Sequence, residues 1–427
     1  MSNGSATSAD VAVIGGGPAG IAGAVTAAES ERDVVLIDDN AKPGGQIWRR
    51  SIENQNSQHA AFWFERLAKS RVRVVSGSRV IHAERGELQV ETDDSISRLR
   101  FEKLILATGA RELFLPFPGW TLPNVVGAGG LQALVKSGLD VAKKRVVVAG
   151  TGPLLLAVAA YLCAHGAEVV CICEQAPMST LTNFAGTMLR FPAKISEAVK
   201  LRLASRKASY LTNAWPVAAT GGERLESVRI SANGRLREIP CDYLACGFHL
   251  VPNTELAQLL GCQLSDGFVA TDDYQQTSMG NVYCAGEPTG IGGMELSILE
   301  GRIAGHAATN KKDEASRLFT ERARYRKLAL AMEKTFRLRH ELKDLASEDT
   351  LVCRCEDVTL GRVRKHTSWK AAKLHTRCGM GPCQGRVCGA AARFLFGWNV
   401  AASRPPVFPA RCSSLAEVSS QVHGGSQ

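Results

Sequence analysis

The sequence predicts an α/β protein, and three observations support this class. Near the N-terminus, and again near the middle of the chain, a short apolar strand, a glycine-rich turn, a helical run and a second strand follow one another. The later apolar segment Val282–Ala285 is typical of a strand that returns to the first of these units. A segment near the C-terminus is rich in cysteine and in basic residues, which indicates a separate small module.

Length and composition fit a globular protein of several domains. The chain has 427 residues, of which 45% are hydrophobic and 22% charged, and this excludes wholesale disorder. No apolar stretch is long enough to span a bilayer, and residues 1–10 contain neither a basic nor an apolar signal region. We expect a cytoplasmic protein, either free or held peripherally at the inner face of the membrane. In that reducing compartment the 13 cysteines are thiols or metal ligands rather than disulfides.

The first glycine-rich turn has the pattern of a dinucleotide site. A strand at Asp10–Ile14 leads into the segment Gly15–Gly20. There Gly15 makes the tight turn, Gly17 lets a pyrophosphate approach the backbone, and Gly20 lets the helix lie close to the strand. The free N–H groups of the helix N-terminus attract phosphate. Asp38 ends the next strand and is placed to bind ribose hydroxyls.

The second turn departs from this pattern. It contains Gly150 and Gly152, but Leu155 occupies the third glycine position, where we expect it to push the helix off the strand or narrow the site. Glu174 ends the following strand and is placed to bind a ribose 2′-hydroxyl, which favours NAD over NADP. Two interpretations stay open: a site for NAD or another adenine nucleotide, and a Rossmann-like fold without a productive nicotinamide site.

Further motifs carry a resemblance to a known family. Pro43–Trp48 follows the first acid, Thr108-Gly109 closes a later strand, and Gly286-Glu287 precedes a glycine-rich helix start. With the paired turns, they resemble the flavoproteins with two dinucleotide-binding domains, of the glutathione and thioredoxin reductase type. The resemblance implies FAD in the first site. That family usually has aspartate where Glu287 stands. The expected cofactor-binding residues are Gly15, Gly17, Pro18, Gly20, Asp38, Gly45, Gln46, Thr108, Gly109, Gly286 and Glu287, with Gly150, Gly152 and Glu174 in the second site.

These patterns predict a discontinuous FAD domain and a small C-terminal domain. The expected parts are residues 1–115 and 246–310 for the FAD-binding domain, 116–245 for the second Rossmann-like domain, 311–347 for a helical linker, 348–400 for a cysteine-rich domain and 401–427 for a tail.

Twelve of the 13 cysteines fall into two sets. Seven of them, from Cys163 to Cys284, lie in apolar contexts and are expected to be structural, with Cys171 and Cys173 pointing to opposite faces of one strand. No C-x-x-C pair occurs, although a dithiol reductase needs one beside its flavin. The second set is the C-terminal group around Cys353-Arg354-Cys355 and Cys378–Cys388.

The C-terminal group resembles the helical module of bacterioferritin-associated ferredoxin, which holds a [2Fe–2S] cluster. The resemblance implies Cys353, Cys355, Cys383 and Cys388 as ligands. It leaves Cys378 outside the set. Residues 358–416 contain ten Lys or Arg and no Asp or Glu, and this charge would stabilise a reduced cluster. The alternative is structural zinc on the same sulfurs.

The segments Trp120–Asn124, Pro252–Leu256 and Thr376–Arg386 carry a further resemblance. Through them, the whole chain resembles the alpha-type chains of opine oxidases and of D-hydroxyproline dehydrogenase, and the B chain of hydrogen cyanide synthase. The resemblance implies an FAD and [2Fe–2S] electron-transfer subunit of a heteromeric amino-acid or opine dehydrogenase. It also implies a substrate-oxidising partner flavoprotein of the glycine/D-amino-acid oxidase type, and it adds an FMN at the interface and one more small chain as candidates. We place no catalytic residue in this chain and expect no nucleic-acid partner. The rival hypotheses are a self-contained NAD(P)H-dependent flavin reductase and a zinc-stapled scaffold without enzymatic activity.

Overall fold

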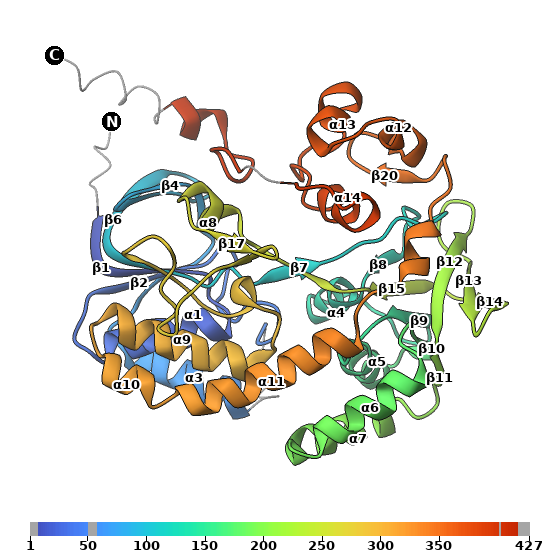
Figure 1. Cartoon of the computed structure of the whole chain (residues 1–427), viewed down its shortest axis with the longest axis horizontal. Helices are drawn as coiled ribbons and strands as arrows, with labels where there is room; N and C mark the ends of the chain where they lie inside the picture. Colours follow the sequence, from blue (N-terminus) through green and yellow to red (C-terminus); the bar gives the residue numbers. More distant parts are fainter. Residues whose placement is uncertain (1–6, 50–57, 401–402, 417–427) are drawn as a thin grey trace. The chain divides into compact units, whose positions relative to one another are not determined.

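The computed structural model describes residues 7–49, 58–400 and 403–416. The chain divides into two units. Figure 1 shows both, with colours that follow the sequence from the N-terminus to the C-terminus. The first unit comprises Met1–Ala110, Pro252–Ala329 and Ala402–Gln427, and the second comprises Arg111–Val251 and Leu330–Ala401. Of the predicted tail, residues 401–402 and 417–427 lie outside the described residues.

The first unit is built on a seven-stranded mixed sheet. Its strands are β1 (Thr7–Ile14), β2 (Val34–Ile37), β3 (Arg73–Val75), β4 (Arg79–Glu84), β5 (Glu87–Glu91), β6 (Ile96–Leu106) and β19 (Val282–Cys284). They run in the order β3-β2-β1-β6-β5-β4, and β19 also pairs with β6. The pairs β3–β2, β2–β1, β1–β6 and β6–β19 are parallel. The pairs β4–β5 and β5–β6 are antiparallel. The four residues of β2 are all buried, as in a strand covered on both faces.

Two helices of this unit touch through glycine. Helix α1 (Pro18–Ala28) follows the first turn, and α9 (Met294–Ala308) follows β19. A side chain at Gly301 would overlap the carbonyl oxygen of Ala19, and one at Gly305 would press on that of Gly23 at 2.6 Å. Because both positions lack a side chain, the backbones of α1 and α9 approach closely and the start of α1 is held in place. The unit's other helical segments are α3 (Gln58–Lys69), α8 (Glu255–Leu259), η1 (Glu287–Thr289) and α10 (Lys312–Ser316).

The second unit contains a five-stranded parallel sheet. Its strands, in the order β11-β10-β9-β15-β8, are β11 (Ser209–Thr212), β10 (Glu168–Glu174), β9 (Arg145–Gly150), β15 (Tyr243–Gly247) and β8 (Val125–Gly127). A three-stranded antiparallel sheet consists of β12 (Ala214–Thr220), β13 (Ser227–Ala232) and β14 (Arg235–Pro240). The helices of this sheet region are α4 (Ala128–Lys136), α5 (Leu154–Ala164), α6 (Met178–Met188) and α7 (Pro192–Ala204).

The cysteine-rich segment belongs to this second unit. Its elements are β20 (Leu351–Cys353), β21 (Val358–Thr359), α12 (Leu360–Arg364), α13 (Trp369–Thr376) and α14 (Cys388–Phe396). The indole of Trp120 donates a hydrogen bond of 2.6 Å to the carbonyl of Leu351. The short helix η2 (His340–Asp344) leads into the segment, and Leu342 is fully buried in the core of the second sheet region.

The chain passes between the units through the short strands β7 (Ala110–Glu112) and β16 (Leu250–Pro252) and through helix α11 (Phe319–Thr335). Two further short strands, β17 (Leu264–Ser265) and β18 (Phe268–Val269), form a small hairpin in the first unit. No helix within the described ranges is both long enough and apolar enough to cross a membrane.

The architecture confirms the predicted α/β class with two Rossmann-like domains. One detail was wrong: the sulfurs of Cys171 and Cys173 lie 3.4 Å apart rather than on opposite faces. Residues two apart in a strand share a face, which explains the contact. Leu155 is also accommodated in a way that the motif alone does not show. Its side chain occupies the space beside Gly247, where an added Cβ would lie 3.2 Å from it.

Candidate functional site

The first glycine turn requires glycine for steric reasons. Gly15 has a φ of 104°, and a side chain there would overlap the carbonyl oxygen of Ala107. A side chain at Gly20 would overlap the carbonyl oxygen of Gly15. Gly17 caps α1 in an extended conformation, and Pro18 follows at the first helical position, where no N–H is needed. The turn therefore presents the N-terminal N–H groups of α1 at the carboxyl edge of the sheet.

Asp38 is held beside this turn. It follows β2 and is only 4% exposed. One carboxylate oxygen accepts the backbone N–H of Gly16 at 2.6 Å, and the other accepts the backbone and side-chain N–H groups of Asn40 at 2.7 Å each. These donors orient the carboxylate at the end of the strand, where a ribose would bind.

A second glycine pair faces the turn. Gly44 and Gly45 have φ values of 135° and 58°, and the N–H of Gly44 donates to the carbonyl of Gly16 at 2.6 Å. A Cβ at Gly45 would lie 3.0 Å from the Cα of Gly17. Backbone therefore faces backbone, and no side chain stands between the two loops. Gln46, the next predicted site residue, is exposed.

Thr108 and Gly109 follow β6, and hydrogen bonds with Asn253 fix their position. The Thr108 hydroxyl donates to the carbonyl of Asn253 at 2.5 Å, and the Asn253 side-chain amide donates to the carbonyl of Thr108 at 2.9 Å. The backbone N–H of Asn253 donates to Gly109 at 2.9 Å. Gly109 has a φ of 66°, and the carboxylate of Glu287 lies 3.8 Å from where its Cβ would be. Burial raises the pKa of Glu287, and a hydrogen bond from the backbone of Ala110 opposes this.

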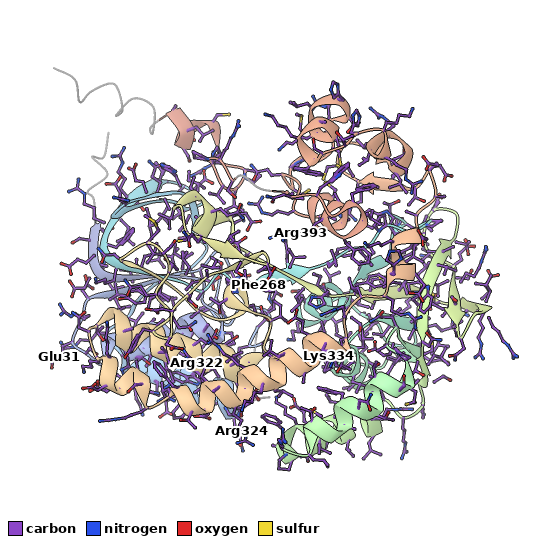
Figure 2. All side chains as sticks on the ribbon, viewed as in Figure 1. Glu31, Phe268, Arg322, Arg324, Lys334 and Arg393 are labelled. Atoms are coloured by element: carbon purple, nitrogen blue, oxygen red, sulfur yellow. The ribbon has the colours of Figure 1, made fainter. Side chains whose placement is uncertain are left out.

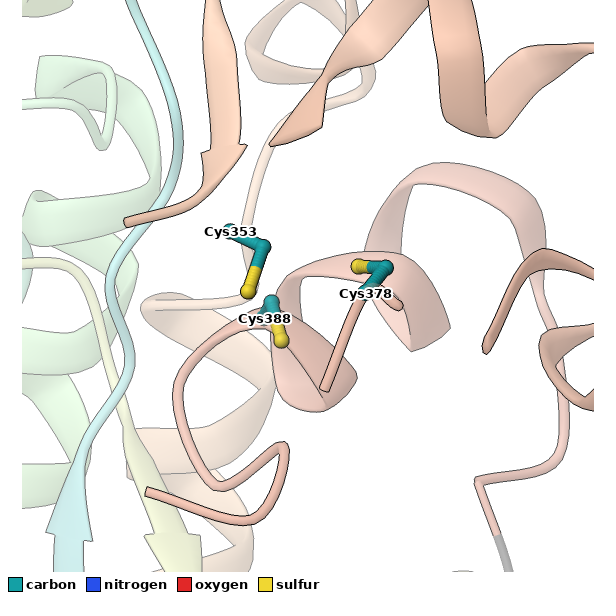
Figure 3. A group of neighbouring side chains, drawn as sticks. All are labelled: Cys353, Cys378 and Cys388. Carbon is teal, nitrogen blue, oxygen red and sulfur yellow. The ribbon is translucent and has the colours of Figure 1, made fainter. Parts of the chain in front are cut away.

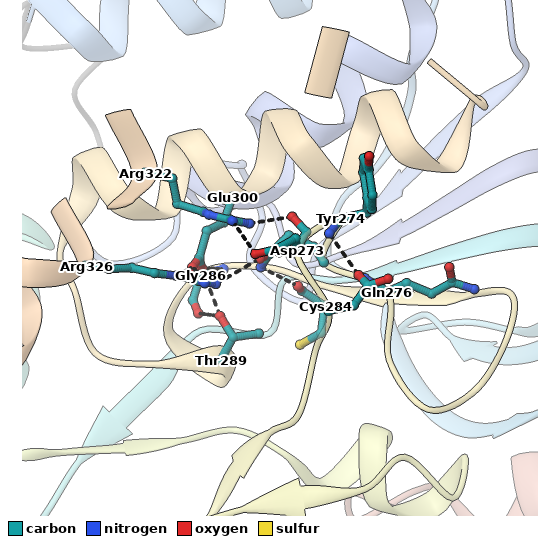
Figure 4. A network of polar contacts seen from close by, with 11 residues as sticks. Asp273, Tyr274, Gln276, Cys284, Gly286, Thr289, Glu300, Arg322 and Arg326 are labelled. Carbon is teal, nitrogen blue, oxygen red and sulfur yellow. Dashed lines mark hydrogen bonds and ion pairs between the residues drawn. The ribbon is translucent and has the colours of Figure 1, made fainter. Parts of the chain in front are cut away.

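The turn at Gly286 is supported by a buried acid that the sequence analysis missed. Glu300 on α9 accepts the N–H of Gly286 at 3.1 Å and the hydroxyl of Thr289 at 2.8 Å on one oxygen. Its other oxygen is paired with Arg326 of α11 at 3.1 Å (Figure 4). Burial raises the pKa of Glu300, and Arg326 offsets part of this effect. The available signal was an acid directly after the mainly apolar residues 296–299.

A second arginine of α11 binds the loop before β19. The guanidinium of Arg322 contacts both the carbonyl and the carboxylate of Asp273, the latter at 2.7 Å (Figure 4). Arg326 also donates to the side-chain oxygen of Gln275 at 3.1 Å. Two cations on α11 thus bind the loop before β19, and Arg326 also supports the turn after β19 through Glu300.

The second glycine turn has a similar acid but different surroundings. Glu174 is fully buried and accepts the hydroxyl of Thr151 at 2.8 Å, the N–H of Gly152 at 2.7 Å and the N–H of Ala176 at 2.9 Å. Gly150 has a φ of 146°, and a side chain there would overlap the backbone of Gly247. Gly152 faces the ring of Phe336, which lies 3.8 Å from the position of an added Cβ.

The cysteine-rich segment brings three thiols together. Within the described residues, Cys353, Cys378 and Cys388 are buried with their sulfurs all within 4.8 Å of one another (Figure 3). Cys353 ends β20, Cys378 follows α13, and Cys388 begins α14. The sequence analysis set Cys378 aside, so its place in this group was not expected. The other two predicted ligands lie beside the group: Cys383 interacts with Cys388 and with the exposed Cys355.

Proton sharing among these thiols favours a thiolate at Cys353. Interactions with Cys378 and Cys388 lower the pKa of Cys353 to about 2, and the N–H of Gly379 lies 3.5 Å from its sulfur. The interaction with Cys353 raises the pKa of Cys378 to about 12 and also raises that of Cys388. An interaction with Cys388 lowers the pKa of Cys383 to about 5.

Small residues let the cysteine loop close tightly. A Cβ at Gly379 would lie 2.6 Å from the ring of Trp369, and one at Gly385 would lie 3.1 Å from it. A side chain at Gly381 would overlap Cys355. Glycine at these positions therefore lets the loop wrap over the indole and brings Cys355 near Cys383. Exposed basic side chains surround the segment, among them Arg393 on α14 (Figure 2).

Both sites fit the groups that the sequence implies. Beside Gly17, only backbone lies within 4.0 Å of an added Cβ, which suits the approach of a pyrophosphate, and Asp38 ends β2 where a ribose would bind. The sulfur donors suit soft metals, and an N–H directed at a ligand sulfur is typical of iron–sulfur surroundings. Five thiols lie in this segment, and the sequence analysis expects four of them as ligands.

Known proteins are similar to this chain over most of its length. The A chain of opine oxidase from Rhizobium meliloti is 33% identical over 89% of this chain and 90% of the relative. The hydrogen cyanide synthase component HcnB of Pseudomonas protegens is 31% identical over 88% of this chain and 89% of the relative. Among solved structures, L-proline dehydrogenase from P. horikoshii gives a TM-score of 0.70 at 21% identity, covering 96% of this chain and 79% of that one. Thioredoxin reductase from T. acidophilum gives 0.56 at 20% identity, covering 72% and 99%.

The family assignment rests on the part of the chain that holds both glycine turns. The model of the pyridine nucleotide-disulphide oxidoreductase family matches residues 9–305, which include the first glycine turn, Thr108-Gly109 and Gly286-Glu287. That family comprises FAD-binding, flavin-dependent oxidoreductases. The chain is a member of the pyridine nucleotide-disulphide oxidoreductase family and is similar over nearly its whole length to the opine oxidase A and HcnB chains.

Proposed function

We propose that this chain is the FAD and [2Fe–2S] electron-transfer subunit of a heteromeric dehydrogenase or oxidase for amino acids or opines. One observation carries the proposal: a glycine turn of the dinucleotide-binding type and a group of buried thiols occur on one chain that has no C-x-x-C dithiol. FAD exchanges electrons in pairs, whereas a [2Fe–2S] cluster carries one at a time, so together they split a pair.

The residues would divide this work between them. Gly15, Gly17 and Asp38 would bind the pyrophosphate and ribose of FAD. Thr108-Gly109 and the Gly286-Glu287 turn would orient the remainder of the cofactor, with Glu300 and Arg326 holding that turn. We retain Cys353, Cys355, Cys383 and Cys388 as the proposed cluster ligands, with Cys378 as a competing fifth thiol.

A partner subunit would oxidise the substrate. The relatives are named as subunits of opine oxidase and of hydrogen cyanide synthase, which supports an assembly with further chains. The proposed partner is a flavoprotein of the glycine/D-amino-acid oxidase type that removes electrons from a C–N bond. In this chain we assign no side chain to proton abstraction, so the chain relays electrons and does not select the substrate.

The test is the cofactor content of the chain purified without air. We expect one FAD and two irons with two labile sulfides per chain, and a paramagnetic signal of a reduced [2Fe–2S] cluster after reduction. Zinc in place of iron, or no bound flavin, would overturn the proposal. Cys388→Ser should lose more than half of the iron, whereas Cys412→Ser, which changes an exposed cysteine outside the group, is the matched control.

A second measurement separates the relay from a self-contained reductase. Anaerobic NADH should leave the bound flavin oxidised, whereas substrate together with the partner flavoprotein should reduce it. Rapid reduction by NADH alone would favour the reductase hypothesis.

A further inference from the structure

The segment Phe336–Arg339 lies where a nucleotide would bind the second Rossmann-like domain. In such sheets the ligand occupies the crevice beyond the carboxyl ends of the strands. Thr151, Gln175 and Asn213 directly follow β9, β10 and β11, and each contacts this segment. All these residues belong to the second unit.

The backbone of the segment is clamped by Gln175. This side chain is fully buried, and its amide nitrogen lies 3.5 Å from the carbonyl of Phe336 and 3.1 Å from that of Arg337. Its oxygen accepts the N–H of Arg339 at 3.1 Å. A single glutamine thus satisfies three backbone groups of the segment, as a strand neighbour would.

The side chains of residues 336–339 also pack against the second glycine turn and its neighbours. The ring of Phe336 faces Gly152, where a pyrophosphate would need to approach, and stacks edge-on against Phe184 of α6 at 5.4 Å. The guanidinium of Arg339 contacts the side-chain oxygen of Asn213 and lies 5.1 Å from the centre of the Trp215 ring. Phe336 is only 9% exposed.

In the first domain, backbone rather than a side chain lies against the turn. Its acid, Asp38, is buried, as Glu174 is, and also binds a turn N–H, so burial of the acid does not distinguish the two sites. The difference lies in what faces the second glycine of each motif. Gly17 faces the bare backbone of Gly45, whereas Gly152 faces an aromatic ring.

The same segment leads into the cysteine-rich module, whose further contacts are also made to this domain. Leu342 and Leu345 pack in its core, and Trp120 donates to the carbonyl of Leu351. Arg111 donates to the carbonyl of Arg386 at 3.2 Å. The domain therefore acts as a support for the module.

We propose that residues 336–339 fill the nucleotide position of the second Rossmann-like domain, so that the domain excludes NAD(H) and other adenine nucleotides and instead anchors the cysteine-rich module. This inference goes beyond the proposed electron-transfer role and does not require it. The rival view is that Phe336 swings aside for a nucleotide.

The first test is a titration of the wild-type, FAD-loaded full chain with NADH and with ATP by calorimetry. We expect no saturable binding tighter than about 1 mM. Saturable binding, with an azido-ATP photolabel recovered on the peptides of Thr151 or Gln175, would overturn the inference. That result would leave the proposed function intact if iron and FAD were still present. Failure of this inference can therefore be distinguished from failure of the proposed function.

The second test measures how the segment is anchored. Gln175→Ala removes the side-chain hydrogen bonds to the backbone of residues 336–339. We expect hydrogen exchange of the amides in residues 336–345 to be faster by about tenfold or more. Gln132→Ala on α4 is the control and should leave this exchange unchanged. Unchanged exchange in Gln175→Ala would overturn the anchoring role, and if that variant does not fold, the wild-type titration decides.

Discussion

Replacing Arg326 by methionine tests how the turn at Gly286 is held. The substitution removes the cation 3.1 Å from the buried carboxylate of Glu300 but keeps much of the side-chain volume. Removing one partner of a fully buried pair costs about 3–5 kcal/mol. The side chain of Arg326 is 39% exposed and that of Glu300 only 3%, so solvent screens part of the interaction. We therefore expect a loss of about 2 kcal/mol in the free energy of unfolding.

Thermal unfolding of the purified chain measures this loss. For a unit of this size, 1 kcal/mol corresponds to about 2–4 °C, so the first transition should fall by about 4–8 °C. Lys327→Met changes an exposed cation on the same helix and should leave the transition in place. Flavin should also be released more readily from Arg326→Met than from this control, because Glu300 binds Gly286.

The effect must depend on pH with a defined sign. Burial already raises the pKa of Glu300 in the folded protein, and loss of Arg326 raises it further. A carboxyl group with a raised folded-state pKa favours folding more as the pH falls through that value. The deficit of Arg326→Met should therefore be largest at high pH and shrink toward acid pH. A deficit that stays constant or grows on acidification, or one that Glu300→Gln in the same chain fails to reduce, would refute the reasoning.

Three further substitutions probe the two units. Gly15→Ala places a side chain on the carbonyl of Ala107 at a positive φ, so the purified chain should lose its flavin absorbance while its iron content is retained. Gly247→Ala introduces a Cβ 3.2 Å from Leu155 and should lower the free energy of unfolding of the second unit by about 1–3 kcal/mol. Adding Leu155→Ala should not restore the stability fully, because Ala128 also lies 3.1 Å from the new Cβ. In Cys388→Ser, the remaining thiols should bind less than half of the wild-type iron in metal analysis, and full iron content would exclude Cys388 as a ligand.

Local patterns allowed much of the fold to be predicted. Gly15, Gly20 and Asp38 lie within one strand–turn–helix–strand unit, so their spacing alone indicates the geometry that the structure has. The pairing of Glu300 with Arg326 was not predictable in this way. The two residues are 26 positions apart and meet only because α11 returns over α9, which depends on tertiary packing.

The thiol group shows where pattern and geometry diverge. Spacing and resemblance selected Cys383 and Cys355, yet the tightest group contains Cys378 with Cys353 and Cys388. Arg377, before Cys378, has a φ of 67°, and the following Gly379 has a φ of 81°. These two left-handed residues end α13 and turn Cys378 inward. A sequence motif does not encode this turn unless its backbone conformation is recognised.

The two glycine turns illustrate why a motif alone does not determine binding. Both present a helix N-terminus and an acid bonded to a turn N–H. Their capacities to bind a nucleotide differ because different segments, distant in the sequence, lie against them. Backbone of Gly45 lies beside the first turn, and the ring of Phe336 lies beside the second. Loss of the third glycine at Leu155 is tolerated because Gly247 supplies the missing space on the neighbouring strand. The side chains that decide whether a ligand can enter therefore lie outside the motif, and the same fold can bind a cofactor in one copy and support a protein module in the other.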